Sequence, residues 1–219
     1  NCGLGPASAG ELAKALSDAS AGIVSINCLA NKFCEEGLST LLASIKDTSV
    51  RSLCGLIEGQ TVADFSGQNL GPIDCKIMAA EFAFQGFIAG INSIGLDGCP
   101  LTGATKDGGM LRSQWQNEDS QMDGFVAICA TIGKLRTISL RDCHLGPASA
   151  AELAKAVSNA GAVLVEVVLD RNFLTGAGQY GCGVDSKMDG FVALCGVLGK
   201  VAKISLANCG LGPASMAEL

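Results

Sequence analysis

The sequence predicts an α/β fold made of repeated strand–helix units that stack side by side. The clearest unit covers residues 135–157, where a short alternating segment is followed by a segment of helical period. In the first segment Ile138 and Leu140 are two residues apart, so on a strand both side chains point to one side. Neither the strand nor the helix can bury its apolar side alone, and the unit therefore needs copies of itself as neighbours.

The second half of this unit has the spacing of a helix. Leu153 and Val157 lie four residues apart on one stripe. Ser149 with Glu152 three residues later has the form of a capping box, in which the serine would begin the helix. We expect the same arrangement at Ser8 and Glu11.

Copies of the strand pattern recur along the whole chain. The pattern is apolar-x-x-apolar-x-apolar-x-x-(Cys/Asn)-x-apolar, and five good copies are found, with a weaker copy and half a copy in addition. The good copies begin at Ile23, Ile91, Leu135, Leu164 and Val201, the weaker copy at Gln60 and the half copy at Asn1. The last apolar positions of successive copies are 29 to 44 residues apart.

This pattern resembles the leucine-rich repeat, and the 29-residue units resemble its ribonuclease-inhibitor-like subclass. The resemblance implies a right-handed solenoid, or horseshoe, with parallel strands on the concave side and helices on the convex side. Residues 1–219 would form a single array of about six to seven repeats. Both ends fall at the same point of the repeat, in NCGLGPAS, so we expect the array to be part of a longer chain and to self-associate through its ends.

The remaining elements follow from their position within each unit. The sequence predicts further helices over 35–45, 72–84, 122–132 and 188–198, with Asp74 as the N-cap of the second of these. Between the units lie three segments that we interpret as insertions, namely 49–59, 103–121 and 175–187. We place the first on the convex or connecting side and expect the other two to be more mobile than the strands.

Composition and charge exclude several classes of protein. The hydrophobic content is 48% with a positive mean hydropathy, as expected if each unit packs against neighbours. No apolar run reaches the ~18 residues of a membrane span. The net charge of −6 and the lack of a basic run argue against nucleic acid as a partner.

The eleven cysteines are spread along the chain without clustering. Cys2, Cys99, Cys143 and Cys209 occupy the Cys/Asn position of the pattern, where equivalent residues stack in a ladder and do not pair. We therefore expect buried, reduced thiols and a cytoplasmic protein. Cys182 lies outside any pattern position, between two glycines.

Candidate chemistry is sparse. Residues 176–181 match G-x-G-x-x-G, but a dinucleotide site requires those glycines to open a helix directly after a strand. Cys143 and His144 are adjacent, so their side chains point apart and cannot act as nucleophile and base; we expect a core cysteine beside an exposed histidine. No C-x-x-C pair or histidine cluster indicates a metal site. We expect no cofactor and no enzymatic activity.

The strand residues that face away from the core form the candidate binding surface. Similar repeat proteins bind other proteins through this face. Arg141 is the candidate hot spot, since arginine is enriched at such positions. The candidate partner-binding residues are Asn27, Asp64, Asp97, Ser139, Arg141, Glu166, Asp170 and Lys203. A protein-interaction scaffold acting through this face or the inserted loops is the first hypothesis. A regulatory role like that of a GTPase-activating repeat protein, or a purely architectural spacer, remains as the alternative.

Overall fold

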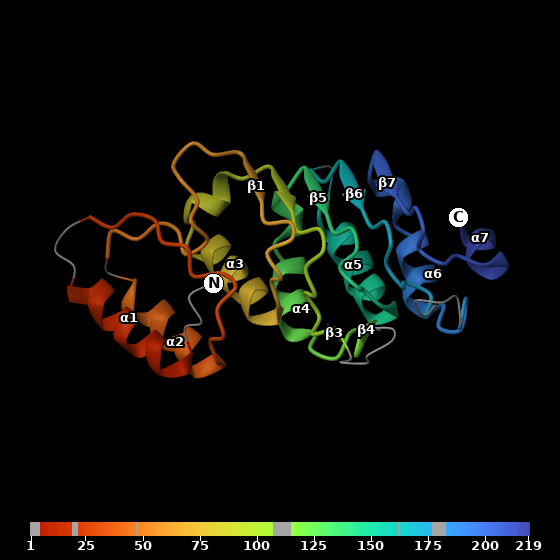
Figure 1. The fold of residues 1–219 in the computed structure, drawn as a ribbon. Coiled ribbons are helices and arrows are strands. Elements are labelled where there is room, and N and C mark those ends of the chain that lie inside the picture. Colours follow the sequence, from red (N-terminus) through yellow and green to blue (C-terminus); the bar gives the residue numbers. More distant parts are fainter. Residues whose placement is uncertain (1–4, 19–21, 47, 107–114, 162, 177–182) are drawn as a thin grey trace.

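The computed structural model describes residues 5–18, 22–46, 48–106, 115–161, 163–176 and 183–219. They form an α/β fold with a parallel five-stranded sheet, as the sequence predicts (Figure 1). In this part of the chain no helix combines the length and apolar character needed to cross a bilayer. The α-helices are α1 (Pro6–Asp18), α2 (Glu35–Ser44), α3 (Pro72–Ala83), α4 (Asp123–Cys129), α5 (Pro147–Asn159), α6 (Asp189–Cys195) and α7 (Pro213–Glu218). The 3-10 helices are η1 (Phe87–Gly90), η2 (Ile132–Lys134) and η3 (Leu198–Lys200).

The sheet follows the order of the chain, β1-β2-β5-β6-β7. Its strands are β1 (Val62–Asp64), β2 (Ser93–Gly95), β5 (Thr137–Ser139), β6 (Glu166–Val168) and β7 (Lys203–Ser205). The predicted register is confirmed, because the first residues of the five strands pair in sequence. The central residue is buried in β1, β2, β5 and β6, and its two neighbours in each strand lie on the other face.

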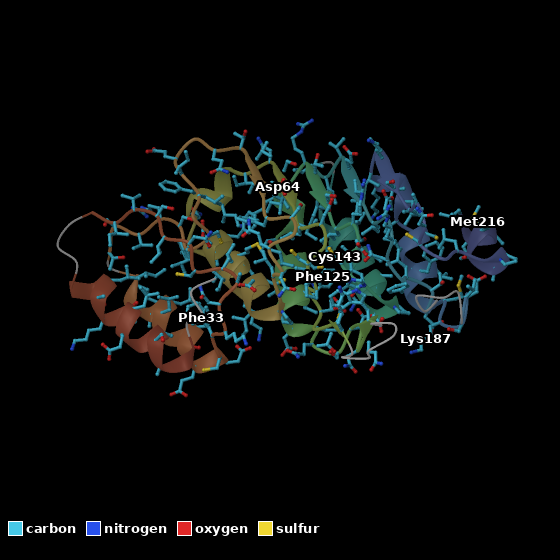
Figure 2. The ribbon with its side chains drawn as sticks, in the orientation of Figure 1. Phe33, Asp64, Phe125, Cys143, Lys187 and Met216 are labelled. Atoms are coloured by element: carbon cyan, nitrogen blue, oxygen red, sulfur yellow. The ribbon has the colours of Figure 1, made fainter. Side chains whose placement is uncertain are left out.

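The helices lie on one side of the sheet only (Figure 1). The core fills the space between the two layers, where Figure 2 places Phe125 and Cys143. Phe82, Phe125 and Phe191, one from each of α3, α4 and α6, are among its largest fully buried side chains. The other side of the sheet carries the strand residues that flank the buried central positions, and we call it the open sheet face.

The helices pack in pairs along the chain, with α1 on α2, α3 on α4 and α5 on α6. Two glycines allow the close approach within a pair. A Cβ atom on Gly124 would collide with the carbonyl oxygen of Pro72, and a Cβ atom on Gly190 would collide with that of Pro147. The G-P and D-G-F motifs of the sequence are therefore the two halves of one helix–helix contact.

The prediction that residues 49–59 are an insertion on the connecting side is wrong. This segment extends alongside the first strand pattern, where the Ser52 and Leu53 carbonyls accept hydrogen bonds from the Ile26 and Cys28 amides at 2.9 and 2.8 Å. Val50, Leu53 and Leu56 are buried, so the segment carries its own share of the core. Ser52, Leu53 and Cys54 are buried in succession, so the segment lacks the regular alternation that identifies a strand.

The first pattern also deviates from the prediction. Ile23, the first apolar position of this copy, is 42% exposed, whereas Leu29, at a variable position of the pattern, is only 4% exposed. Further along the chain, Glu81 of α3 connects the segment 49–59 to the helix layer by hydrogen bonds. Its buried carboxylate accepts hydrogen bonds from the amides of Leu53 at 2.8 Å and Cys54 at 3.1 Å. The two amides that it binds have no backbone acceptor on a neighbouring strand in the described chain.

The predicted helix starts at 35 and 72 are confirmed, but the predicted N-caps Asp74 and Ser149 are each three residues too late. Helix α5 begins at Pro147 with Gly146 as its N-cap, and α3 begins at Pro72 with Gly71 as its N-cap. Proline is favoured at the first helical position because it has no amide to leave unpaired and its φ is already helical. Ser149 and Asp74 therefore lie inside the first turn of their helices. Helix α1 likewise begins before Ser8, at Pro6.

The segment 103–121 is not a simple loop. It contains a two-stranded antiparallel pair, β3 (Thr105–Lys106) and β4 (Trp115–Gln116). Its last residues return to the body of the molecule, where the Gln121 amide donates to the Thr102 carbonyl at 2.9 Å. The Lys187 amide donates in the same way to the Thr175 carbonyl at 3.0 Å, so both insertions close at equivalent points.

Candidate functional site

Seven of the eight predicted partner-binding residues lie in the strands of the sheet or shortly after them, with unequal exposure, whereas Asn27 lies outside the sheet in a β-bridge with Cys54. Of the eight, four are exposed, three are half-buried, and Asp170 is buried. The exposed residues are Asn27, Asp64, Arg141 and Lys203, and the half-buried ones are Asp97, Ser139 and Glu166. Four of the eight lie in strands β1, β5, β6 and β7, and three lie two residues beyond a strand, namely Asp97, Arg141 and Asp170.

Two aspartates clasp the next strand–helix unit across the sheet. The Asp97 Oδ1 atom accepts hydrogen bonds from Ser139 Oγ at 2.5 Å and from the Arg141 amide at 3.0 Å. Asp170 Oδ1 accepts from Ser205 Oγ at 2.5 Å and from the Ala207 amide at 2.8 Å. Asp97, Ser139 and Asp170 are thus engaged within the molecule, which removes them from the residues freely available to a partner.

The clasp also affects the charge of Asp170. Burial alone would raise the pKa of this carboxyl group, but hydrogen bonds from Ser205 and Ala207, together with nearby Arg141, outweigh burial and hold the pKa below its usual value. Asp170 is therefore an anion at neutral pH.

The cations of the open sheet face are paired across neighbouring strands. Arg141 Nη2 lies 3.3 Å from Asp170 Oδ2, and Lys203 Nζ lies 2.6 Å from Glu166 Oε1. Arg141 and Lys203 nevertheless keep 51% and 67% of their side chains exposed. Together with the exposed Asp64, they are charged groups through which this face can contact another molecule.

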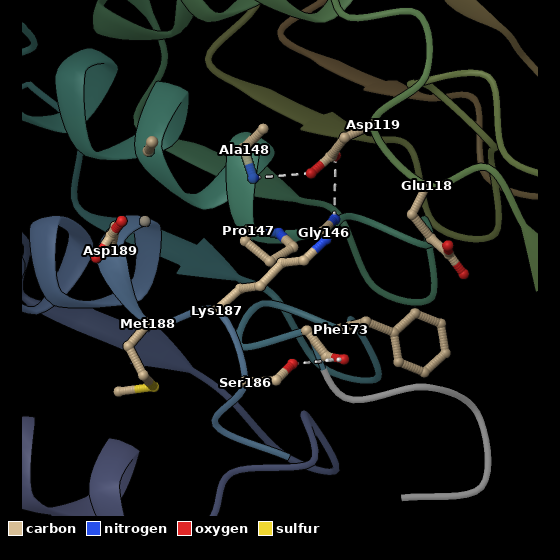
Figure 3. A pocket seen from close by; sticks show the side chains of 13 residues that line it. Glu118, Asp119, Gly146, Pro147, Ala148, Phe173, Ser186, Lys187, Met188 and Asp189 are labelled. Atoms are coloured by element: carbon tan, nitrogen blue, oxygen red, sulfur yellow. Dashed lines mark hydrogen bonds between the residues drawn. The ribbon is translucent and has the colours of Figure 1, made fainter. Parts of the chain in front are cut away.

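A hollow of about 640 Å³ lies between the two insertions (Figure 3). Its floor is the first turn of α5, with Glu118 and Asp119 of the first insertion on one wall. Phe173, Lys187 and Met188 belong to the opposite wall. Its size is within the ~300–1,000 Å³ of small-molecule pockets.

The anion-binding end of α5 in this hollow is already occupied by the protein's own carboxylate. Asp119 accepts hydrogen bonds from the amides of Gly146 at 3.1 Å, Ala148 at 2.8 Å and Ser149 at 3.2 Å, and from the Ser149 hydroxyl (Figure 3). Asp185 repeats this role at α7. A phosphate would therefore find these amides taken, despite the general affinity of helix N-termini for anions.

The glycine pattern at 176–181 does not open a helix. Gly176 lies in a turn with φ +82°, and the next helix, α6, begins only at Asp189. Gly178 and Gly181 lie outside the described residues, as do Tyr180 and Cys182. The geometry around Gly176 is not that of a dinucleotide fingerprint, in which the glycines lead directly into the helix.

His144 is buried, and the prediction of an exposed histidine is wrong. Its ring stacks on Trp115 with centroids 3.7 Å apart and lies 6.1 Å from the Phe173 ring. Burial lowers the pKa of this imidazole below its usual value. The single tryptophan of the first insertion covers His144, which a reading of the strand pattern alone cannot reveal.

The cysteines at the Cys/Asn position are buried and free, as predicted for Cys99, Cys143 and Cys209. Each thiol points toward a backbone carbonyl of the preceding unit; Cys143 Sγ lies 3.1 Å from the Leu96 oxygen. Asn172 at the same position bonds the Leu140 carbonyl at 2.8 Å. Burial raises the pKa of Cys143 far above its usual value, so this thiol is not an activated nucleophile.

No protein-family model and no curated protein matches the chain. Within the described residues, no group of three or more His, Cys, Asp or Glu side chains could hold a metal ion. The geometry of the open sheet face and of the insertions is thus the basis for a functional proposal.

The sequence does contain a signal for the two capping aspartates. Asp119 and Asp185 each begin the motif D-S-x-M-D-G, and each lies 27 residues before the glycine whose amide it binds, Gly146 or Gly212. The recurrence of this motif at the end of both insertions indicates a common structural role.

Proposed function

We propose that the chain is a leucine-rich-repeat array of the ribonuclease-inhibitor-like subclass, whose open sheet face lines the concave side of a right-handed solenoid and binds another protein. The repeated strand–helix units, their one-to-one register and the stacked Cys/Asn positions support this proposal. Binding is proposed in preference to catalysis because Cys143 and His144 face different surroundings. The buried free thiols favour a reducing, cytoplasmic location.

The observation that carries the proposal is a parallel sheet with one face that no described helix covers. All-parallel sheets almost always have helices on both faces. Here the helices lie on one side, and the other side exposes polar and small residues held in register by the Asp97 and Asp170 clasps (Figure 1). A rigid, polar and uncovered sheet face is the kind of surface that repeat proteins use for partners.

Site-specific photo-crosslinking tests which face meets a partner. A photoreactive side chain at Arg141 should crosslink a defined protein in an extract of the source cell, whereas the same group at Val192, exposed on the helix side, should not. Equal labelling from both positions, or none from Arg141, would support the architectural alternative.

A matched pair of charge reversals then measures the contribution of the face. Lys203 and Lys155 are each paired with a glutamate at 2.6 Å and are 67% and 68% exposed, but Lys155 lies on helix α5. We expect Lys203→Glu to weaken binding of the crosslinked partner about fivefold or more, and Lys155→Glu to leave it unchanged. The reverse result would place the interface on the helices.

Self-association through the ends of the array is a further part of the proposal. Strand β7 has a strand neighbour on one side only in the described chain, and its central residue Ile204 and the following Leu206 are only half-buried. Unpaired strand edges with apolar neighbours favour contact with another chain. Light scattering over a concentration series should show association, and a strictly monomeric species at high concentration would contradict it.

A further inference from the structure

A second, smaller hollow lies where the C-terminal ends of α2 and α3 meet the extra segment after α2. Its volume is about 360 Å³. Helices α2 and α3 belong to different helix pairs and pack together only loosely, which leaves this space open. The lining is mainly apolar and includes Leu42, Ile45, Val50 and Phe84.

Two cations, Lys46 and Arg51, also line this hollow. Both are exposed, and neither side chain has an ion-pair partner among the residues that the structure describes. No carboxylate belongs to the described lining. An apolar hollow with a few placed polar groups at its border is the usual composition of a small-molecule site.

The equivalent junction between α4 and α5 provides an internal comparison. It contains a hollow of about 310 Å³, but its Lys155 is neutralised by Glu152 at 2.6 Å within the same lining. At one junction the cation is thus neutralised within the lining, whereas at the other the two cations have no ion-pair partner among the described residues. The difference indicates that an anionic group is missing from the α2/α3 hollow.

We propose that the hollow between α2 and α3 binds an anionic amphiphile, an alkyl carboxylate whose chain lies against Leu42, Ile45 and Phe84. Its carboxylate contacts Lys46 and Arg51. Burial of the alkyl chain supplies the affinity, and the charge-assisted contacts select an anion over a neutral or cationic head group. The site lies on the helix side and is independent of partner binding at the open sheet face.

Titration calorimetry of the full chain with dodecanoate, below its micelle concentration, tests the proposal. We expect one site per chain, and weaker binding of 1-dodecanol and of dodecyltrimethylammonium, which share the chain but lack the anion. Equal affinity for the cationic and anionic probes, or the absence of dodecanoate binding, would overturn the proposal. If dodecanoate does not bind, an acidic amphipathic helix of a partner protein becomes the candidate occupant of the hollow.

Variants locate the binding. The double variant Lys46→Glu/Arg51→Glu should weaken dodecanoate binding about tenfold, whereas Lys155→Glu, at the equivalent junction, should not change it. Ala83→Trp places an indole in the hollow from an exposed position and should abolish binding while circular dichroism remains that of the parent chain. Retained binding in Ala83→Trp would mean that the probe lies elsewhere, and the proposal would fail.

Discussion

Asp97 on the strand-end of one unit accepts a 2.5 Å hydrogen bond from Ser139 on the next, so that one carboxylate joins β2 to β5. The same oxygen also accepts from the Arg141 amide. Removing a half-buried acceptor leaves its donors unpaired, so Asp97→Ala should lower the free energy of unfolding by about 1–3 kcal/mol. Chemical denaturation measures this loss.

Asp64→Ala is the control for this variant. The Asp64 carboxylate is exposed and bonds the Ser66 amide within its own unit at 3.0 Å. Its removal should cost less than about 1 kcal/mol. Equal losses for the two variants would mean that the contact across units does not contribute to stability.

Asp170 predicts an acid-sensitive fold. Its pKa in the folded protein lies below the value of 3.8 for an unperturbed aspartate, so between the two values the unfolded chain binds more protons. The stabilisation is complete above the unfolded pKa and is lost as the pH falls through the folded pKa. The free energy of unfolding should therefore decrease as the pH falls below 3.8, and Asp170→Asn should reduce this decrease; an unchanged pH profile in Asp170→Asn would contradict the assignment.

Two helix glycines should respond in opposite directions to the same substitution. Gly124→Ala drives a methyl group into the Pro72 carbonyl of α3, and we expect a loss of about 1–3 kcal/mol. Gly10→Ala in α1 meets nothing within 4 Å and should stabilise by about 0.5–1 kcal/mol, because alanine is the better helix former. Thermal denaturation distinguishes them, and a stabilising Gly124→Ala would disprove the close helix pairing.

The first insertion should stabilise α5 through Asp119. Asp119→Ala leaves the amides of Gly146 and Ala148 without their acceptor, and loss of such a helix cap costs about 1–2 kcal/mol. The adjacent Glu118, for which no hydrogen bond is found in the described chain, is the control; Glu118→Ala should stay within about 0.5 kcal/mol. Amide exchange at the start of α5 should accelerate only in Asp119→Ala.

The thiols should divide by accessibility. Cys34 and Cys195 are half-buried and should react with iodoacetamide in the folded protein. Cys99, Cys143 and Cys209 should react only after unfolding, since burial both raises their pKa and blocks the reagent. Peptide mass spectrometry identifies the modified residues, and early labelling of Cys143 would contradict its place in the core.

Much of the fold follows from local sequence, because the repeat pattern determines which strand residues pair. The central positions Ile94, Ile138 and Val167 were identified correctly from a period of two. The N-cap of α5 was misplaced because the sequence offers two start signals, a serine that can cap and a proline that favours the first helical position. The helix begins at Pro147, and Ser149 lies in its first turn. The segment 49–59 pairs with residues 24–28, but its apolar residues do not alternate regularly, so the sequence does not identify it as a strand.

The site was less predictable than the fold, because its chemistry depends on contacts between distant residues. The strand pattern correctly placed Asp97 and Asp170 on the open sheet face, but it carries no information that each bonds to a serine of the next unit. Likewise, the stacking of Trp115 on His144 depends on where an insertion folds back. Their role in partner binding stays a prediction, and Asp97, Ser139 and Asp170 also stabilise the fold through contacts between units.

The pairing of the helices limits how such an array can change in length during evolution. D-S-x-M-D-G recurs from Asp119 to Asp185, and G-P-A-S from Gly146 to Gly212, with the same offset. With each recurrence the chain gains one more helix with D-G-F and one more helix with G-P, the two motifs that form the Gly–Pro contact. A duplication or deletion of two units preserves every such contact, whereas a change of one unit leaves a helix facing a neighbour that lacks the glycine. Changes in the number of units would therefore be tolerated in even steps.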